Sequence, residues 1–114
     1  MMPLGADLSR SAPRFLSRMG DDTMPKFLIE RRIPGLGSFT EEQMRTIAQR
    51  SNSVLYDLGP HIQWLQSYVT ANRMYCVYIA PSEDLIRQHA KCGTFPVDDI
   101  MPIERIIDPT TGGA

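Results

Sequence analysis

Residues 61–81 read HIQWLQSYVTANRMYCVYIAP and predict two short strands joined by a tight turn at Ala71 and Asn72. Asn72 tolerates left-handed backbone dihedrals, which suits a two-residue hairpin turn. In a half-buried hairpin, one face is expected to be apolar and the other polar. Here both faces are largely apolar, so the fold must provide a cover for each of them.

The segments before the hairpin predict a strand at residues 26–33 and a helix from about Thr40 to Asp57. Thr40 and Gln43 have the spacing of a capping box. Apolar and small residues follow the cap at steps of three and four, which is typical of one buried helical face. This stripe consists of Met44, Ile47, Ala48, Ser51, Leu55 and Leu58.

The segments after the hairpin predict a second helix and a last strand. The helix is expected to begin after Ser82 as its cap and to stop at Gly93. The last strand is expected at residues 100–108, with Pro102 favouring a position at the edge of the sheet.

The resulting order, β-α-β-β-α-β, predicts an α+β, ferredoxin-like fold with a four-stranded antiparallel sheet and two helices on one face. The helices can cover only one side of the sheet. A monomer would expose roughly several hundred Å² of apolar surface on the other side, which is more than monomers usually tolerate. A second copy related by a two-fold axis would cover it, so we expect a homodimeric α/β barrel.

A two-residue turn would pair Tyr68 with Tyr75 and Trp64 with Ile79 on one face of the hairpin. We expect the face that carries Trp64, Tyr68 and Tyr75 to form the dimer interior. The side chains of the opposite face are smaller and would let the helices approach closely.

The composition describes one soluble domain. The chain has 114 residues, of which 42% are hydrophobic and 22% charged, and its net charge is -1. This balance argues against a nucleic-acid or acidic-membrane partner, because both usually need a concentrated basic patch. No apolar run approaches the roughly 20 residues of a membrane span. Cys76 and Cys92 are too few for a disulfide scaffold, so we expect a reducing, cytoplasmic setting.

Residues 1–23 are rich in Ser, Arg, Gly and Pro and lack a sustained period. They predict a flexible N-terminal extension, followed by the domain at residues 24–111 and a short tail at residues 112–114. Two alternatives stay open: Met24 is the biological start, or the extension is a docking tail.

Several short stretches of the sequence also resemble a known family. They are MPKFLIERRIPG, QWLQSYVT, YCVYIAP, IRQHA followed by GTFP, and IDPTT, and together they span about residues 24–111. They are similar to small bacterial ferredoxin-like proteins of a family of unknown function, whose best-known member is described as nickel-binding. The resemblance implies a ferredoxin-like dimer and a link to nickel, and it implies no reaction.

Nickel(II) favours imidazole nitrogen and carboxylate oxygen, with thiolate in some sites. The chain has two histidines, His61 at the entrance to a strand and His89 on the apolar stripe of the second helix. We take both as candidate ligands with Glu30, and a two-fold axis could double such a site. The carboxylates of Asp57 and Glu83 are further candidates.

Each candidate ligand also has a structural interpretation. His89 would be a core histidine satisfied by a neighbour, and His61 a solvated residue at a strand end. Glu30 would pair with Arg105 or with another arginine on a neighbouring strand.

The preferred prediction is therefore a cytoplasmic, homodimeric metal-binding protein, with nickel as the metal and a sensing, storage or stress role rather than catalysis. The alternative is a dimeric barrel enzyme, oxygenase- or isomerase-like, acting on a small hydrophobic substrate in the dimer interior. Tyr68, Tyr75 and Tyr78 could offer hydroxyl groups there. No Ser-His-Asp or Cys-His arrangement is visible in the sequence. A pure interaction module is the third possibility.

Overall fold

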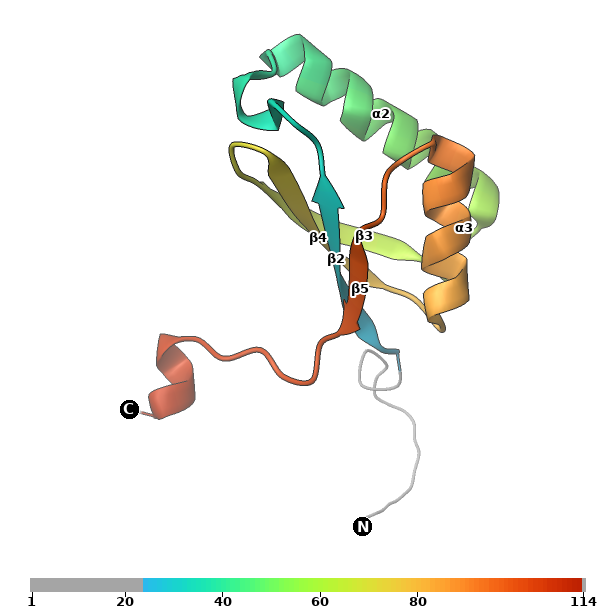
Figure 1. The fold of residues 1–114 in the computed structure, drawn as a ribbon. Coiled ribbons are helices and arrows are strands. Elements are labelled where there is room, and N and C mark those ends of the chain that lie inside the picture. Colours follow the sequence, from blue (N-terminus) through green and yellow to red (C-terminus); the bar gives the residue numbers. More distant parts are fainter. Residues whose placement is uncertain (1–23, 114) are drawn as a thin grey trace.

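The computed structural model describes residues 24–113, so the predicted extension at residues 1–23 lies outside the described part. Four strands form one antiparallel sheet in the order β3-β4-β2-β5, and α2 and α3 lie on one side of it (Figure 1). This α+β arrangement is consistent with the predicted ferredoxin-like fold. The elements are β2 (Lys26–Arg32), η3 (Leu36–Ser38), α2 (Glu41–Leu58), β3 (Gln63–Val69), β4 (Arg73–Ile79), α3 (Glu83–Gly93), β5 (Asp99–Pro102) and η4 (Pro109–Gly112).

Local signals set the ends of the helices. The Thr40 side chain accepts a hydrogen bond from the Gln43 backbone N–H, and the Gln43 side chain accepts one from the Thr40 N–H, which confirms the capping box. Ser82 is the N-cap residue of α3, but its side chain makes no capping hydrogen bond. The helix ends at Gly93, and Thr94 follows in the left-handed region at a φ of 56°.

The hairpin turn is the predicted one. The Thr70 N–H donates to the Arg73 carbonyl oxygen at 2.9 Å, which leaves Ala71 and Asn72 as the two turn residues. The Asn72 side chain also accepts a hydrogen bond from the backbone N–H of Gly35 at 2.9 Å. The turn is therefore tied to the loop that leads into α2.

The register of the hairpin differs from the predicted one at its far end. A bulge between Trp64 and Gln66 shifts the pairing, so that Trp64 lies opposite Tyr78 instead of Ile79. Trp64 then packs against the core on the helix side of the sheet. The expectation that Trp64 belongs to the dimer face is wrong, because an extra residue in one strand breaks the alternation of faces.

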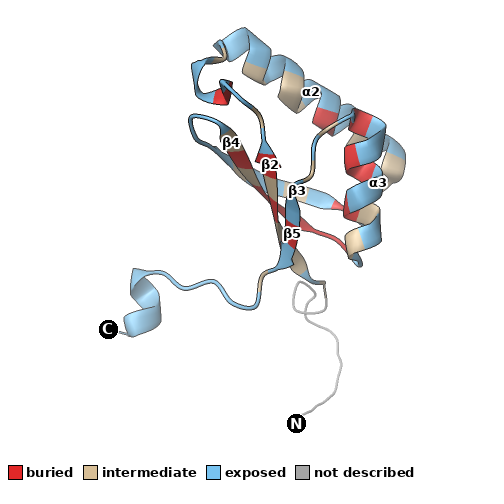
Figure 2. Cartoon of the chain, in the orientation of Figure 1, coloured by how far each residue is buried: buried red, intermediate tan, exposed pale blue. Residues whose placement is uncertain are grey.

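The core lies between the sheet and the two helices (Figure 2). Every second residue of β2 is buried, and α3 faces the same layer with most of its predicted stripe. The buried residues of the two central strands on this face are Phe27, Ile29, Arg31, Met74, Cys76 and Tyr78, and those of α3 are Ile86, His89, Ala90 and Gly93.

Helix α2 is much less buried than its apolar stripe predicts. Ser51 is the buried residue of this helix, while Met44, Ile47 and Ala48 are half-buried (Figure 2). All three line a cavity between the helix and the sheet.

The last strand is shorter than predicted. Pairing with β2 runs to Pro102, and the Ile103 N–H still donates to the Lys26 carbonyl at 2.8 Å. Strand β2 begins at Lys26, so residues beyond this point have no strand to pair with. The chain then leads away from the sheet (Figure 1), and Ile106 and Ile107 are 63% and 69% exposed.

Neither of the helices within residues 24–113 is long and apolar enough to cross a bilayer.

Candidate functional site

A cavity of about 460 Å³ lies between α2 and the helix side of the sheet. Its walls are mostly apolar, and no aspartate or glutamate within residues 24–113 lines it. Three arginines reach it, namely Arg31, Arg32 and Arg50. The apolar lining is contributed by Ile33, Pro34, Phe39, Met44, Ile47, Ala48, Trp64, Val69, Met74, Phe95 and Pro96.

Arg31 is the most unusual residue of the wall. It follows Phe27 and Ile29 in the inward alternation of β2, and it is 2% exposed. Its Nη1 donates to the Pro96 carbonyl oxygen at 2.8 Å, while its buried Nη2 has no hydrogen-bond partner among the described residues. A buried charge that lacks a counter-charge is costly.

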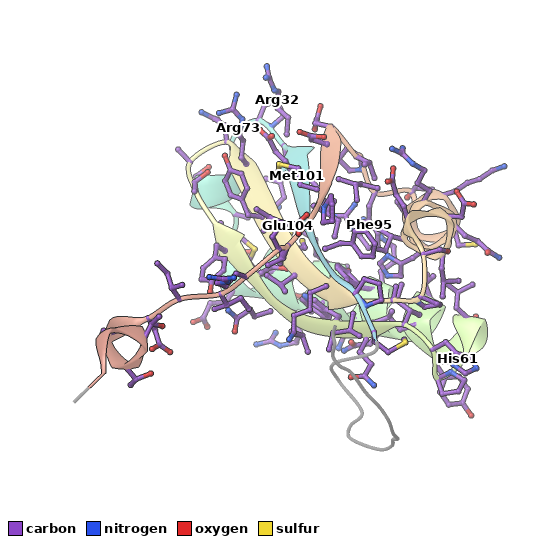
Figure 3. All side chains as sticks on the ribbon, turned by 90° about the horizontal axis from the view of Figure 1, so that it is seen from below. Arg32, His61, Arg73, Phe95, Met101 and Glu104 are labelled. Atoms are coloured by element: carbon purple, nitrogen blue, oxygen red, sulfur yellow. The ribbon has the colours of Figure 1, made fainter. Side chains whose placement is uncertain are left out.

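Phe95 connects Arg31 to two other side chains of the site. The Cζ atoms of Arg31 and Arg50 lie 5.4 Å and 4.9 Å from the centroid of its ring, and these are cation–π distances. The His89 ring stacks on Phe95 with 5.5 Å between the centroids. Figure 3 shows Phe95 between α3 and the strands.

Ser51, His89 and Tyr78 form a polar cluster at the same wall. The Ser51 hydroxyl lies 3.2 Å from Nε2 of His89 and 3.5 Å from the Tyr78 hydroxyl. Burial, with help from the positive charge of Arg31, lowers the pKa of His89 to about 4. Burial also raises the pKa of Tyr78 above its ordinary value. Both side chains are therefore neutral at pH 7.

The contact between Ser51 and His89 was not predicted from the sequence. A signal existed, because Ser51 is the polar member of an otherwise apolar stripe and His89 lies on the stripe of the other helix. A serine nucleophile needs a base with a pKa near the working pH and an acid that orients this base. Here the pKa of His89 is about 4, and its buried Nδ1 has no partner among the described residues. The geometry is that of a core histidine in which Ser51 satisfies Nε2 and no described residue satisfies Nδ1.

Glu30 lies on the opposite side of the sheet, because its neighbours Ile29 and Arg31 point toward the helices. Its Oε2 is 3.1 Å from Nε of Arg73 on the adjacent strand β4. An arginine on a neighbouring strand was one of the partners expected for Glu30.

His61 is exposed and lies just before β3. It is at one end of the hairpin, and Arg73, which follows the turn, is at the other end (Figure 3). The three predicted ligands His61, His89 and Glu30 therefore occupy three separate places in one chain. Within residues 24–113, no group of three or more His, Cys, Asp and Glu side chains could hold a metal ion. Their role as ligands stays a prediction, and it needs donors from outside the described part of one chain.

The sheet, the two helices and the cavity define a small α+β domain of ferredoxin-like type. Residues 27–103 match the family described as "Nickel responsive protein SCO4226-like", and the chain belongs to this family. The crystal structure of SCO4226 from Streptomyces coelicolor A3(2) is similar in fold, with a TM-score of 0.61 at 18% identity, over 72% of this chain and 99% of that chain. No curated protein matches the chain in sequence.

Proposed function

We propose that this chain is a cytoplasmic, homodimeric protein that binds nickel and serves a sensing, storage or stress role. The observation that carries this proposal is the membership of residues 27–103 in a family described as nickel-responsive. The proposal has two parts, the assembly and the metal site, and each rests on different residues.

The outer side of the sheet supports the assembly. Tyr68 is 55% exposed on this side, and Met101 is 36% exposed. Their apolar neighbours on the same face are Leu28 and Tyr75, which are half-buried, and Val77 and Ile79, which are each 9% exposed in the single chain. The surface left open on this side is therefore centred on Tyr68 and Met101. A second copy placed sheet to sheet would cover this surface, and it could also receive the exposed Ile106 and Ile107 of the C-terminal segment.

The three candidate ligands have different surroundings, and one of them is better suited to bind a metal than the other two. His89 is a poor ligand for a cation, because it is enclosed and lies beside the positive charge of Arg31. Glu30 is engaged with Arg73. His61 presents an exposed imidazole, which nickel(II) favours together with carboxylate oxygen. We therefore take His61 as the principal ligand, with the remaining donors supplied by a second copy.

Calorimetric titration of nickel chloride into tag-free, full-length protein tests the proposal. A tag must be absent because its histidines would bind nickel themselves. We expect saturable binding that His61→Ala weakens at least about tenfold, since even the loss of an outer-shell partner costs that much. His89→Gln is the matched control and should bind as the parent does.

Two results would contradict the proposal. Absence of nickel binding at micromolar concentration would contradict the proposed nickel-binding role. Equal nickel affinity in the parent and in His61→Ala would show that His61 is not a ligand.

A further inference from the structure

We propose that the cavity between α2 and the sheet binds a small amphipathic carboxylate, whose apolar body fills the cavity and whose carboxylate pairs with Arg31 and Arg50. This site is independent of the proposed nickel ligand, because His61 does not line the cavity. It also lies on the helix side of the sheet, away from the surface that a second copy would cover.

The dimensions of the cavity fit a small molecule. Its volume of about 460 Å³ lies within the roughly 300–1,000 Å³ that ligand pockets usually occupy. The half-buried stripe of α2 forms one wall, with Met44, Ile47 and Ala48, and Trp64 and Met74 of the sheet lie opposite. An apolar ligand body would complete the burial that this stripe lacks.

The charge of the lining selects an anion. Among the described residues, the wall holds three arginines and no carboxylate, and the described ion pairs, Arg73 with Glu30 and Arg87 with Glu83, lie elsewhere. The Cζ atoms of Arg31 and Arg50 both lie within 5.4 Å of the Phe95 ring centroid, so both guanidinium groups flank the same side chain of the cavity wall. Guanidinium groups in such a wall favour a carboxylate, because it accepts paired hydrogen bonds from them.

The hydrogen bonds of Arg31 point to the same class of ligand. The Pro96 carbonyl accepts from Nη1, and Nη2 keeps donor capacity that no described group accepts. A ligand carboxylate would supply both the missing acceptor and the missing negative charge. A neutral apolar ligand would supply neither of them.

The fluorescence of Trp64 can report ligand binding, because Trp64 is the single tryptophan of the chain and lines the cavity. Octanoate is a suitable probe, since it carries one carboxylate and does not absorb where tryptophan emits. We expect a saturable change in Trp64 emission on titration of octanoate into the full-length protein. Octanamide, which has the same shape without the charge, should bind at least about tenfold more weakly.

Variants locate the site. Ala48→Phe should abolish octanoate binding by filling the cavity, and Arg31→Met and Arg50→Met should each remove most of the preference for octanoate over octanamide. Arg87→Met is the matched control, because Arg87 is an exposed arginine paired with Glu83 outside the cavity. It should bind octanoate as the parent does.

The proposal is overturned if octanoate gives no saturable change, if octanamide binds equally well, or if Ala48→Phe retains parental affinity. The comparison of octanoate with octanamide uses the parent protein, so it decides the matter even if Arg31→Met does not fold. Nickel titration is a separate measurement, and its outcome leaves this test unaffected.

Discussion

The Ser51 hydroxyl lies 3.2 Å from Nε2 of His89, which joins the middle of α2 to the buried face of α3. The contact is enclosed, since Ser51 is 4% exposed and His89 is fully buried. The burial of His89, with the nearby charge of Arg31, makes the stability of the domain dependent on the protonation of His89.

Stability should fall as the pH is lowered from about 6.5 toward 4. The pKa of His89 is lowered from 6.5 to about 4 by burial, so the unfolded chain takes up the proton first. The contribution of neutral His89 to stability is fully present above pH 6.5. It is lost as the pH falls from 6.5 to about 4, and the total loss in the free energy of unfolding is on the order of 3 kcal/mol. Urea unfolding followed by circular dichroism at pH 7.5, 5.5 and 4.5 measures it.

His89→Gln should flatten this dependence, because glutamine does not titrate. His61→Gln is the control, since His61 is exposed, and it should keep the parental slope. An identical slope in the parent and in His89→Gln would refute the assignment of the effect to His89.

Ser51→Ala should lower the free energy of unfolding by about 1–3 kcal/mol, because it leaves Nε2 of His89 buried without its hydrogen bond. Chemical denaturation at pH 7.5 gives the value. Ser53→Ala is the matched control on an exposed position of the same helix. Equal stability of the two variants would mean that the contact contributes nothing.

Gly93→Ala should destabilise the domain by about 1–3 kcal/mol through overpacking. A Cβ at Gly93 would lie 2.3 Å from the Phe95 ring, which is held between His89 and two arginines. Gly112→Ala, where a Cβ meets nothing within 4 Å, is the control. Thermal unfolding of both variants checks the expectation, and an unchanged Tm for Gly93→Ala would show that the ring moves freely.

Tyr68→Glu should shift the proposed dimer toward monomer, because it places a charge on the exposed outer side of the sheet. Sedimentation velocity over a range of concentrations measures the shift. Tyr56→Glu is the control, since Tyr56 is 87% exposed on α2. A parent protein that sediments as a monomer at every concentration would contradict the dimer itself.

The sequence predicted the features that depend on neighbouring residues. The capping box of Thr40 and Gln43, the turn at Ala71 and Asn72 and the buried stripe of α3 were all confirmed. Each of them is set by side chains within a few positions of one another, which is the range over which spacing is informative.

The features that depend on distant partners were predicted less well. The bulge before Gln66 moved Trp64 to the other face, and alternation alone cannot anticipate an extra residue. The length of β5 depends on where β2 begins. The cavity depends on how far α2 stands from the sheet. Arg31 was not singled out from the sequence, and the structure shows it buried on the same face of β2 as Phe27 and Ile29.

The ion pair between Glu30 and Arg73 would limit how firmly the two subunits of the proposed dimer bind each other through the sheet. Both side chains are partly exposed, at 25% and 42%, and a partner lying over them would displace the water that hydrates them. That loss offsets some of the gain from covering Tyr68 and its neighbours. Such a dimer would exchange its subunits, and protein concentration would govern how much of it forms.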